Sequence, residues 1–324
     1  MDAVYGIIVL EQRRCGVNIQ LKSYAKINLS LDVKGVTGDG MHLVEMVMQQ
    51  ILLCDDIAMS WTPGADGLEI SLKTNRRFLP TDERNLAYKA ALVMNEIRGG
   101  DANGKLEINI KKRIPVAAGL AGGSGNGAAV LHGLNVLWGM DLSLEELCGA
   151  GARLGSDVPF CVMGQAAEND VLKDRFATDH LACHCALATG TGTDLEPLKG
   201  LESHIVLSKP PISVSTAKAY QGIDSIEIPE RPDTEELIEG LKTKDYSRIE
   251  KNMVNVLENY TLKEYPTVVY TKNKMQEMCA GRAVLMSGSG PSVYGLTGSI
   301  KESRAICAEM AKINRESFWT RTTF

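Results

Sequence analysis

The chain has 324 residues, of which 44% are hydrophobic and 23% are charged, and its formal net charge is -5 at pH 7. This length allows two domains, and no apolar run approaches the ~18 residues that a membrane span needs. The mildly acidic balance gives no reason to expect nucleic acid or an acidic membrane as a partner. "GIIVL" near the N-terminus is too short and wrongly flanked for a secretory signal, and eight scattered cysteines without a CxxC pair predict reduced thiols in the cytoplasm.

The first recognisable element is a strand over residues 20–33, in which apolar and polar residues alternate. Its polar face, which includes Lys26, is expected to be solvated if the pattern is taken alone. Residues 1–18 show no clear pattern and are predicted to form a poorly ordered N-terminal extension. A helix is predicted over residues 82–97, and a second alternating strand over residues 105–116.

A glycine-rich stretch, "PVAAGLAGGSGNGAAVL" from Pro115 to Leu131, follows the second strand and turns helical near Ser124. The first N–H groups of a helix have no intrahelical partner and favour negative charge, and glycines let the backbone wrap an oxygen-rich group. The stretch therefore predicts a phosphate site, with a ligand-free glycine-rich cap as the alternative. Its spelling excludes a Walker-type loop and disfavours a Rossmann dinucleotide fingerprint.

A further helix is predicted from the text "LSLEEL", because Ser143 and Glu146 have the spacing of a capping box. This helix should run to about Leu154 and end before the text "GSDVP". Asp157 lies in that text, and its pattern alone indicates a turn or cap residue ahead of Val158 and Pro159.

Three stretches, in this order along the chain, resemble the three sequence motifs of the GHMP kinases. They are "SYAKINLSLDV" (residues 23–33), "PVAAGLAGGSGNGAA" (115–129) and "VLMSGSGPSVYGL" (284–296), and the third implies a glycine turn beside the phosphate loop. The resemblance covers most of residues 19–164 and 185–312. It implies a two-domain α+β GHMP kinase fold with an ATP-binding N-terminal domain over 19–175, a C-terminal domain over 176–324, and the active site in the interdomain cleft.

The same resemblance implies the reaction. It points to an ATP-dependent kinase, with Mg²⁺, that phosphorylates the 2-hydroxyl of a cytidine diphosphate-linked sugar alcohol in the non-mevalonate isoprenoid precursor pathway. Another small-molecule kinase of the family, or a nucleotide-binding sensor without activity, remain as alternatives. We expect a cytoplasmic monomer or weak homodimer that binds neither nucleic acid nor membrane.

The resemblance also assigns roles to single residues. Lys26 and Asp157 are the catalytic pair, in which the aspartate accepts the proton of the substrate hydroxyl and the lysine stabilises charge. The residues assigned to the substrate are Asn28, His42, Thr216 and Tyr220. The residues assigned to ATP are Asn85, Lys112, Pro115, Gly119, Leu120, Ala121, Gly122, Gly123, Ser124, Gly125 and Asn126.

The sequence departs from the family pattern at three places. Met41 stands where an aromatic residue is usual, and Gly125 stands where a second small hydroxyl is usual, which is expected to change phosphate or magnesium contacts. The segment Gln165–His184 is read as an insertion and is expected to be a solvent-exposed hairpin. His180, Cys183, His184 and Cys185 lie close together here, but their spacing fits no standard zinc pattern and no metal site is predicted.

Overall fold

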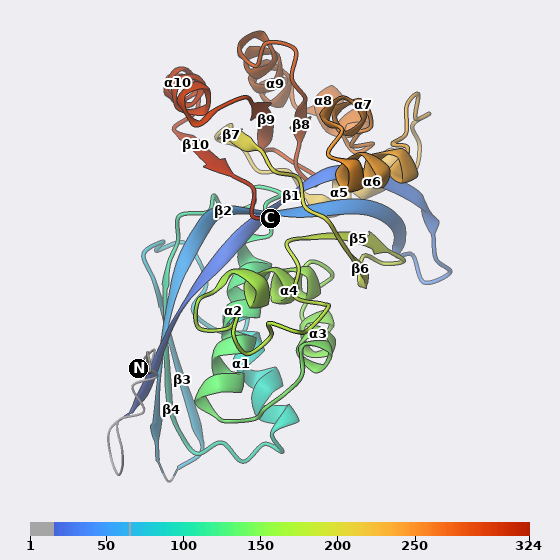
Figure 1. Cartoon of the computed structure of the whole chain (residues 1–324). Coiled ribbons are helices and arrows are strands. Elements are labelled where there is room, and N and C mark those ends of the chain that lie inside the picture. Colours follow the sequence, from blue (N-terminus) through green and yellow to red (C-terminus); the bar gives the residue numbers. More distant parts are fainter. Residues whose placement is uncertain (1–15, 65) are drawn as a thin grey trace, which may run out of the picture.

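The computed structural model describes residues 16–64 and 66–324, and its first half is a six-stranded sheet with helices packed on one face (Figure 1). The sheet order is β3-β4-β2-β5-β6, and β1 also pairs with β2. Its strands are β1 (Val17–Val36), β2 (His42–Pro63), β3 (Leu68–Thr74), β4 (Gly104–Lys111), β5 (Cys185–Thr189) and β6 (Asp194–Leu198). The helices are α1 (Leu86–Ile97), α2 (Gly122–Leu137), α3 (Leu144–Ala152) and α4 (Val158–Glu168).

The second half is a four-stranded antiparallel sheet, in the order β10-β7-β9-β8, with helices around it (Figure 1). Its strands are β7 (His204–Lys209), β8 (Val284–Met286), β9 (Val293–Thr297) and β10 (Glu316–Arg321). The helices are α5 (Thr216–Ile223), α6 (Thr234–Thr243), α7 (Tyr246–Lys251), α8 (Glu258–Glu264), α9 (Pro266–Met278) and α10 (Ile300–Met310). Within the described residues, no helix combines the length and the apolar character needed to cross a membrane.

The long strands β1 and β2 connect the two halves. They pair antiparallel along almost their whole length, from Val17 opposite Trp61 to Val36 opposite His42. One section of the pair packs on α1 and α2, and another packs on the second sheet, so each half buries apolar residues of β1 and β2. The C-terminus returns to the same place, where the Thr323 N–H donates to the Gln50 carbonyl at 3.2 Å.

Most elements predicted from local pattern are present, with shifted ends. The predicted strand over 20–33 is β1, and the predicted helix over 82–97 starts later, at Leu86, because the side chain of Asn85 accepts a hydrogen bond from Ala87 N–H and caps the helix. The capping box of α3 is confirmed. Of the predicted extension over 1–18, residues 1–15 lie outside the described residues, while residues 17 and 18 already belong to β1.

The predicted polar face of β1 is not solvated, which corrects the expectation from the alternating pattern. Lys26, Asn28 and Asp32 are all buried. The reason is that segments of the second half bring partners to these side chains: Asn28 Oδ1 accepts from Gly288 N–H at 3.1 Å, and the Asp32 carboxylate accepts from the Arg231 guanidinium. An alternating strand reports which residues share a face, but not what lies over that face.

The last strands of the first sheet lie beyond the domain boundary that the sequence predicts. β5 and β6 follow the expected domain boundary at 175/176, yet both belong to the first sheet, because β5 pairs antiparallel with β2 with Met46 opposite Ala188. The change to the second sheet therefore comes after Leu198.

The segment Gln165–His184 is not the exposed hairpin that the sequence predicts. α4 continues through its first residues to Glu168. Beyond α4, Leu172 and Phe176 are buried in the core with α2, and Phe176 packs edge-on against His132 with ring centroids 5.7 Å apart. Asn169 is also buried, and its side chain exchanges hydrogen bonds of 2.7 and 2.9 Å with the backbone of Lys22. The buried apolar residues and the hydrogen-bonded amide of Asn169 make this segment part of the fold.

Truncation of Phe176 tests this correction. We expect Phe176→Ala to lower the free energy of unfolding by about 3–5 kcal/mol, because it empties a filled core position. Val171→Ala, at an exposed position of the same segment, is the control and should change the free energy of unfolding by less than about 0.5 kcal/mol. Urea unfolding measures both, and an equally small effect of the two substitutions would return the segment to the role of a surface loop.

Candidate active site

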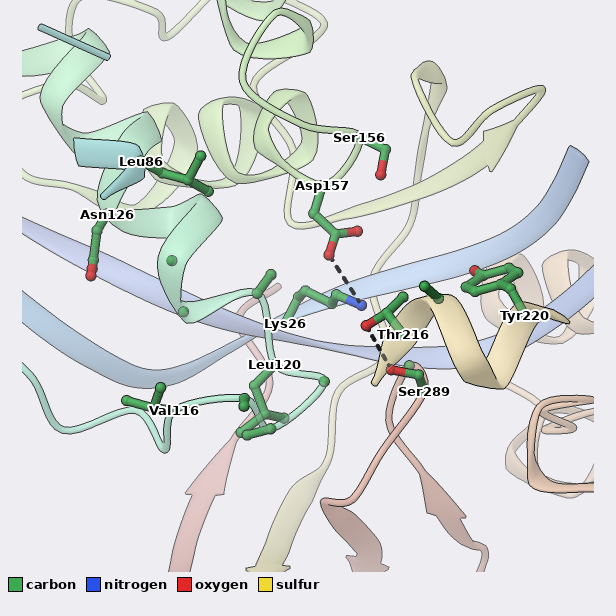
Figure 2. A pocket seen from close by; sticks show the side chains of 18 of the residues that line it. Lys26, Leu86, Val116, Leu120, Asn126, Ser156, Asp157, Thr216, Tyr220 and Ser289 are labelled. Atoms are coloured by element: carbon green, nitrogen blue, oxygen red, sulfur yellow. Dashed lines mark hydrogen bonds and ion pairs between the residues drawn. The ribbon is translucent and has the colours of Figure 1, made fainter. Parts of the chain in front are cut away.

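A cavity of about 750 Å³ lies where the two halves meet, and most of the predicted site residues line it (Figure 2). The walls come from β1, the start of β2, the loop before α2, the start of α4 and the start of α5. The predicted residues that line it are Lys26, His42, Asn85, Lys112, Pro115, Gly119, Leu120, Ala121, Gly122, Gly123, Asn126, Asp157, Thr216 and Tyr220. The predicted residues that lie outside this lining are Asn28, Ser124 and Gly125.

The loop before α2 has the backbone form of an anion site. Ala117, Gly119 and Ala121 have positive φ values of 50°, 72° and 54°, so the chain turns sharply three times before the helix begins. Ala121 is the N-cap, and no side chain of the described residues caps α2. The first helical hydrogen bond is donated by Gly125 N–H to the Ala121 carbonyl at 2.8 Å. The N–H groups before it are therefore available to an anion.

The second and third motifs touch, as the resemblance implies. Ser287 Oγ donates to the Gly119 carbonyl at 2.9 Å. A Cβ on Gly119 would lie 2.1 Å from the Ser287 carbonyl oxygen, so only glycine fits between the two turns. The conformation of the phosphate loop is thus held by a segment almost 170 residues further along the chain.

Lys26 and Asp157 face each other across the cavity, with Nζ and Oδ2 3.8 Å apart (Figure 2). The Lys26 side chain is only 5% exposed, whereas that of Asp157 is 30% exposed. Asp157 is the N-cap residue of α4 but makes no capping hydrogen bond through its side chain to the described residues, so its carboxylate is available in the cavity. Irregular pairing in β1 on either side of Lys26, after Tyr24 and after Asn28, directs the lysine into the site.

Asn28 lies behind Lys26 rather than in the wall. Its Oδ1 accepts hydrogen bonds from Lys26 Nζ at 2.7 Å and from Gly288 N–H at 3.1 Å. Asn28 is completely buried. These contacts make it a support for the lysine and a link between the first and third motifs.

The other three residues assigned to the substrate, His42, Thr216 and Tyr220, line another part of the cavity. The rings of His42 and Tyr220 are 5.0 Å apart and tilted by 50°, and His42 Nε2 lies 3.0 Å from a carboxylate oxygen of Asp224. Burial raises the pKa of Tyr220, and the charge of Asp157 raises it further. Thr216 Oγ1 lies 3.0 Å from Ser289 Oγ, a residue of the third motif. Met41, half exposed, belongs to the same wall.

Lys112 and Asn126 point away from the open part of the cavity, into a buried polar cluster. Lys112 Nζ donates to the Asp55 carboxylate, to Asn126 Oδ1 at 3.1 Å and to the Gly122 carbonyl at 3.3 Å. Burial lowers the pKa of Lys112, and the Asp55 carboxylate opposes this shift. Asp55 also accepts from Arg113 N–H at 2.6 Å and from Ile114 N–H at 2.9 Å, so it holds the loop entry.

Asp55 is the residue that sequence reasoning missed. Its signal was a pair of acidic residues inside the apolar strand "ILLCDDIAM", since a carboxylate buried in a strand needs partners.

Asn85 and Gly125, two other residues predicted to contact ATP, make contacts within the protein instead. The amide of Asn85 caps α1 and donates to the Pro80 carbonyl at 2.8 Å, so its hydrogen-bonding groups are engaged at the rim of the cavity. Gly125 lies on the side of α2 that faces β1, because a Cβ built on it would point toward Ser23 and not into the cavity. The absence of a side chain at this position thus allows the close packing of α2 on β1.

The histidines and cysteines of residues 180–185 do not converge. The structure holds no group of three or more His, Cys, Asp or Glu side chains arranged for a metal ion in its described part. His180 is largely exposed, whereas His184 is partly buried with Nε2 3.1 Å from a Glu168 carboxylate oxygen. Burial lowers the pKa of His184.

Comparisons with known proteins agree with this geometry. The family of GHMP kinases N terminal domains matches residues 85–165, and the family of GHMP kinases C-terminal domains matches residues 237–314. A 4-diphosphocytidyl-2-C-methyl-D-erythritol kinase from Alkaliphilus metalliredigens is 45% identical over 279 residues, which is 86% of this chain and 87% of that one. Its counterpart from Alkaliphilus oremlandii is 42% identical over 94% of this chain and 96% of its own length.

The chain belongs to the 4-diphosphocytidyl-2-C-methyl-D-erythritol kinase family. This confirms the family assignment made from the three motifs, and it makes the protein an ATP-using small-molecule kinase of the GHMP type. A solved structure of a 4-(cytidine 5'-diphospho)-2C-methyl-D-erythritol kinase superimposes with a TM-score of 0.75 at 25% identity, over 94% of this chain and all of that one. Homoserine kinase from Cytophaga hutchinsonii shares the fold, with a TM-score of 0.66 at 18% identity.

Proposed function

We propose that the protein transfers the γ-phosphoryl group of ATP to the 2-hydroxyl of 4-diphosphocytidyl-2-C-methyl-D-erythritol, as a cytoplasmic enzyme of the non-mevalonate isoprenoid pathway. The observation that carries the proposal is the Lys26–Asp157 pair, which lies in one cavity with the turn before α2. The family to which the chain belongs supplies the identity of the substrate.

In this proposal each end of the cavity has its own task. The backbone N–H groups at the start of α2 bind the ATP phosphates. Asp157 accepts the proton of the attacking hydroxyl, and Lys26, 3.8 Å away, stabilises negative charge on the phosphoryl group. The aromatic ring of Tyr220 packs against the cytosine, and His42 bonds to its edge.

The site also suits Mg²⁺. This ion keeps several waters and takes one or two carboxylates together with substrate phosphates, and Asp157 is the carboxylate that the described part of the chain offers to this cavity. Bound there, Mg²⁺ would neutralise charge on the phosphates.

A coupled kinase assay with the purified protein tests the function directly. ATP-dependent turnover of the cytidine diphosphate-linked substrate is expected, and a substrate without the base should be phosphorylated poorly. Equal turnover of both would favour another small-molecule kinase of the family. Nucleotide binding without turnover of either would favour a sensor.

Tyr220→Ala tests the proposed cytosine site. Loss of one stacking surface should raise KM for the cytidine substrate about tenfold or more, while calorimetric ADP binding stays unchanged. Tyr220→Phe should retain most of the affinity, because the ring and not the hydroxyl makes the contact. Tyr270→Ala, at an exposed tyrosine on α9, is the control. An unchanged KM in Tyr220→Ala would remove this residue from the substrate site.

A further inference from the structure

We propose that Ser23 and Gly125 form a coupled pair of positioning residues, in which the Ser23 hydroxyl orients Asn126 and thereby holds the first turn of α2 in its phosphate-binding conformation. The inference rests on the proposed ATP site at that turn. It concerns two residues from different motifs that lie next to each other where α2 packs on β1, and not in the wall of the cavity.

The contact between α2 and β1 is closest at these two residues. A Cβ built on Gly125 would lie 2.7 Å from Ser23 Oγ and 3.1 Å from the Tyr24 carbonyl oxygen. Real Cβ atoms are essentially never found at the first of these distances, so a side chain on residue 125 would displace the Ser23 hydroxyl from its present position. Ser23 Oγ therefore occupies the space into which a side chain at position 125 would project.

The Ser23 hydroxyl has a specific partner. Asn126 Nδ2 donates to Ser23 Oγ at 2.9 Å and to Asp55 Oδ2 at 2.9 Å, which uses both hydrogens of the amide. All three residues are buried, so the amide has no access to water as a substitute. Without the hydroxyl, one amide hydrogen of Asn126 is left without an acceptor, which is costly in a buried position.

The cluster leads from this amide to the phosphate-binding turn. Asn126 Oδ1 accepts from Lys112 Nζ, and the same Nζ donates to the Gly122 carbonyl of the first turn of α2. Gln165 Nε2 donates to the Gly125 carbonyl at 2.8 Å, close to Ser23 Oγ. Lys112 thus links the first turn of α2 to the Asn126 amide through its two hydrogen bonds. Ser23 fixes the orientation of that amide.

Four variants separate the hydroxyl from the packing. Ser23→Ala removes the hydroxyl, and we expect KM for ATP and the Kd for ADP to rise about three- to tenfold, with kcat within about twofold of wild type. Gly125→Ser should lower Tm and ADP affinity, because its Cβ meets Ser23 Oγ. Ser23→Ala/Gly125→Ser places a hydroxyl in the same space from the helix side and should recover ADP affinity and part of Tm. Ser23→Ala/Gly125→Ala fills that space with a methyl group alone, so it should reach a similar Tm but keep the weak ADP binding of Ser23→Ala; in both double variants the Tyr24 carbonyl stays 3.1 Å from the new Cβ.

The two double variants decide the inference. Tighter ADP binding by the Ser-containing double variant than by the Ala-containing one supports a positioning hydroxyl. Equal affinities, or a wild-type KM for ATP in Ser23→Ala, would overturn it. If Gly125→Ser alone does not fold, the double variants still give the answer, because both lack the Ser23 hydroxyl. Wild-type protein that binds no ADP would contradict the ATP site itself, which keeps the two failures distinct.

Discussion

Asp157→Asn is expected to lower kcat by about 10²–10⁴ and to leave the binding of ADP without Mg²⁺ intact. The amide keeps the size of the carboxylate but cannot accept the proton of the substrate hydroxyl. The fold should survive, because the Asp157 side chain is partly exposed and caps nothing in the described part of the chain. Lys26 keeps its other partner, Asn28, at 2.7 Å.

Single-turnover kinetics and ADP calorimetry measure the two parts of this expectation. Asp170→Asn is the matched control, since its side chain is 89% exposed, and this variant should behave as wild type. Near-normal turnover by Asp157→Asn would remove Asp157 from the role of general base.

Gly119→Ala is expected to be the most damaging single methyl in the phosphate loop. The residue has a φ of +72°, and the added Cβ would lie 2.1 Å from the Ser287 carbonyl oxygen. Because that neighbour is backbone, the third-motif turn and the loop must separate. We expect a loss of about 2–4 kcal/mol in the free energy of unfolding and at least about tenfold weaker ADP binding.

Gly139→Ala isolates backbone strain from this collision. Gly139 has a φ of +59°, but a Cβ there meets nothing within 4 Å. It should therefore cost only about 1 kcal/mol and leave ADP affinity unchanged. Urea unfolding and calorimetry distinguish the two variants, and equal effects would mean that the contact between the second and third motifs does not hold the loop.

Several site features could be predicted from the sequence because they are local. The phosphate loop is a run of glycines directly before a helix, and the capping box of α3 needs only two residues three apart. Lys26 and Asp157 were assigned as a catalytic pair from the family resemblance, and the structure brings their side chains within 3.8 Å. Their local patterns alone favoured a solvated lysine and a turn aspartate, so it was the resemblance to the family that pointed to a catalytic role.

Other features depend on which distant segments meet. Asp55 and Lys112 are 57 positions apart and form a buried pair, and no spacing rule predicts that contact. Gln165–His184 reads as a polar insertion, yet Leu172 and Phe176 enter the core beside α2. Whether an apolar residue in a polar segment is buried is decided by the surface that it reaches in the folded chain.

The sequence by itself therefore determined the family, the fold class and the location of the glycine-rich turn before α2, because these depend on motifs of contiguous residues. The tertiary structure alone decided which polar residues face the cavity and which are buried beneath it. Asn28 and Asn126 were assigned to ligands, but their amides are engaged by Lys26 and by Ser23 and Asp55. The physical reason is that an amide serves equally well toward a ligand or toward the protein, and only the position of its partners distinguishes the two.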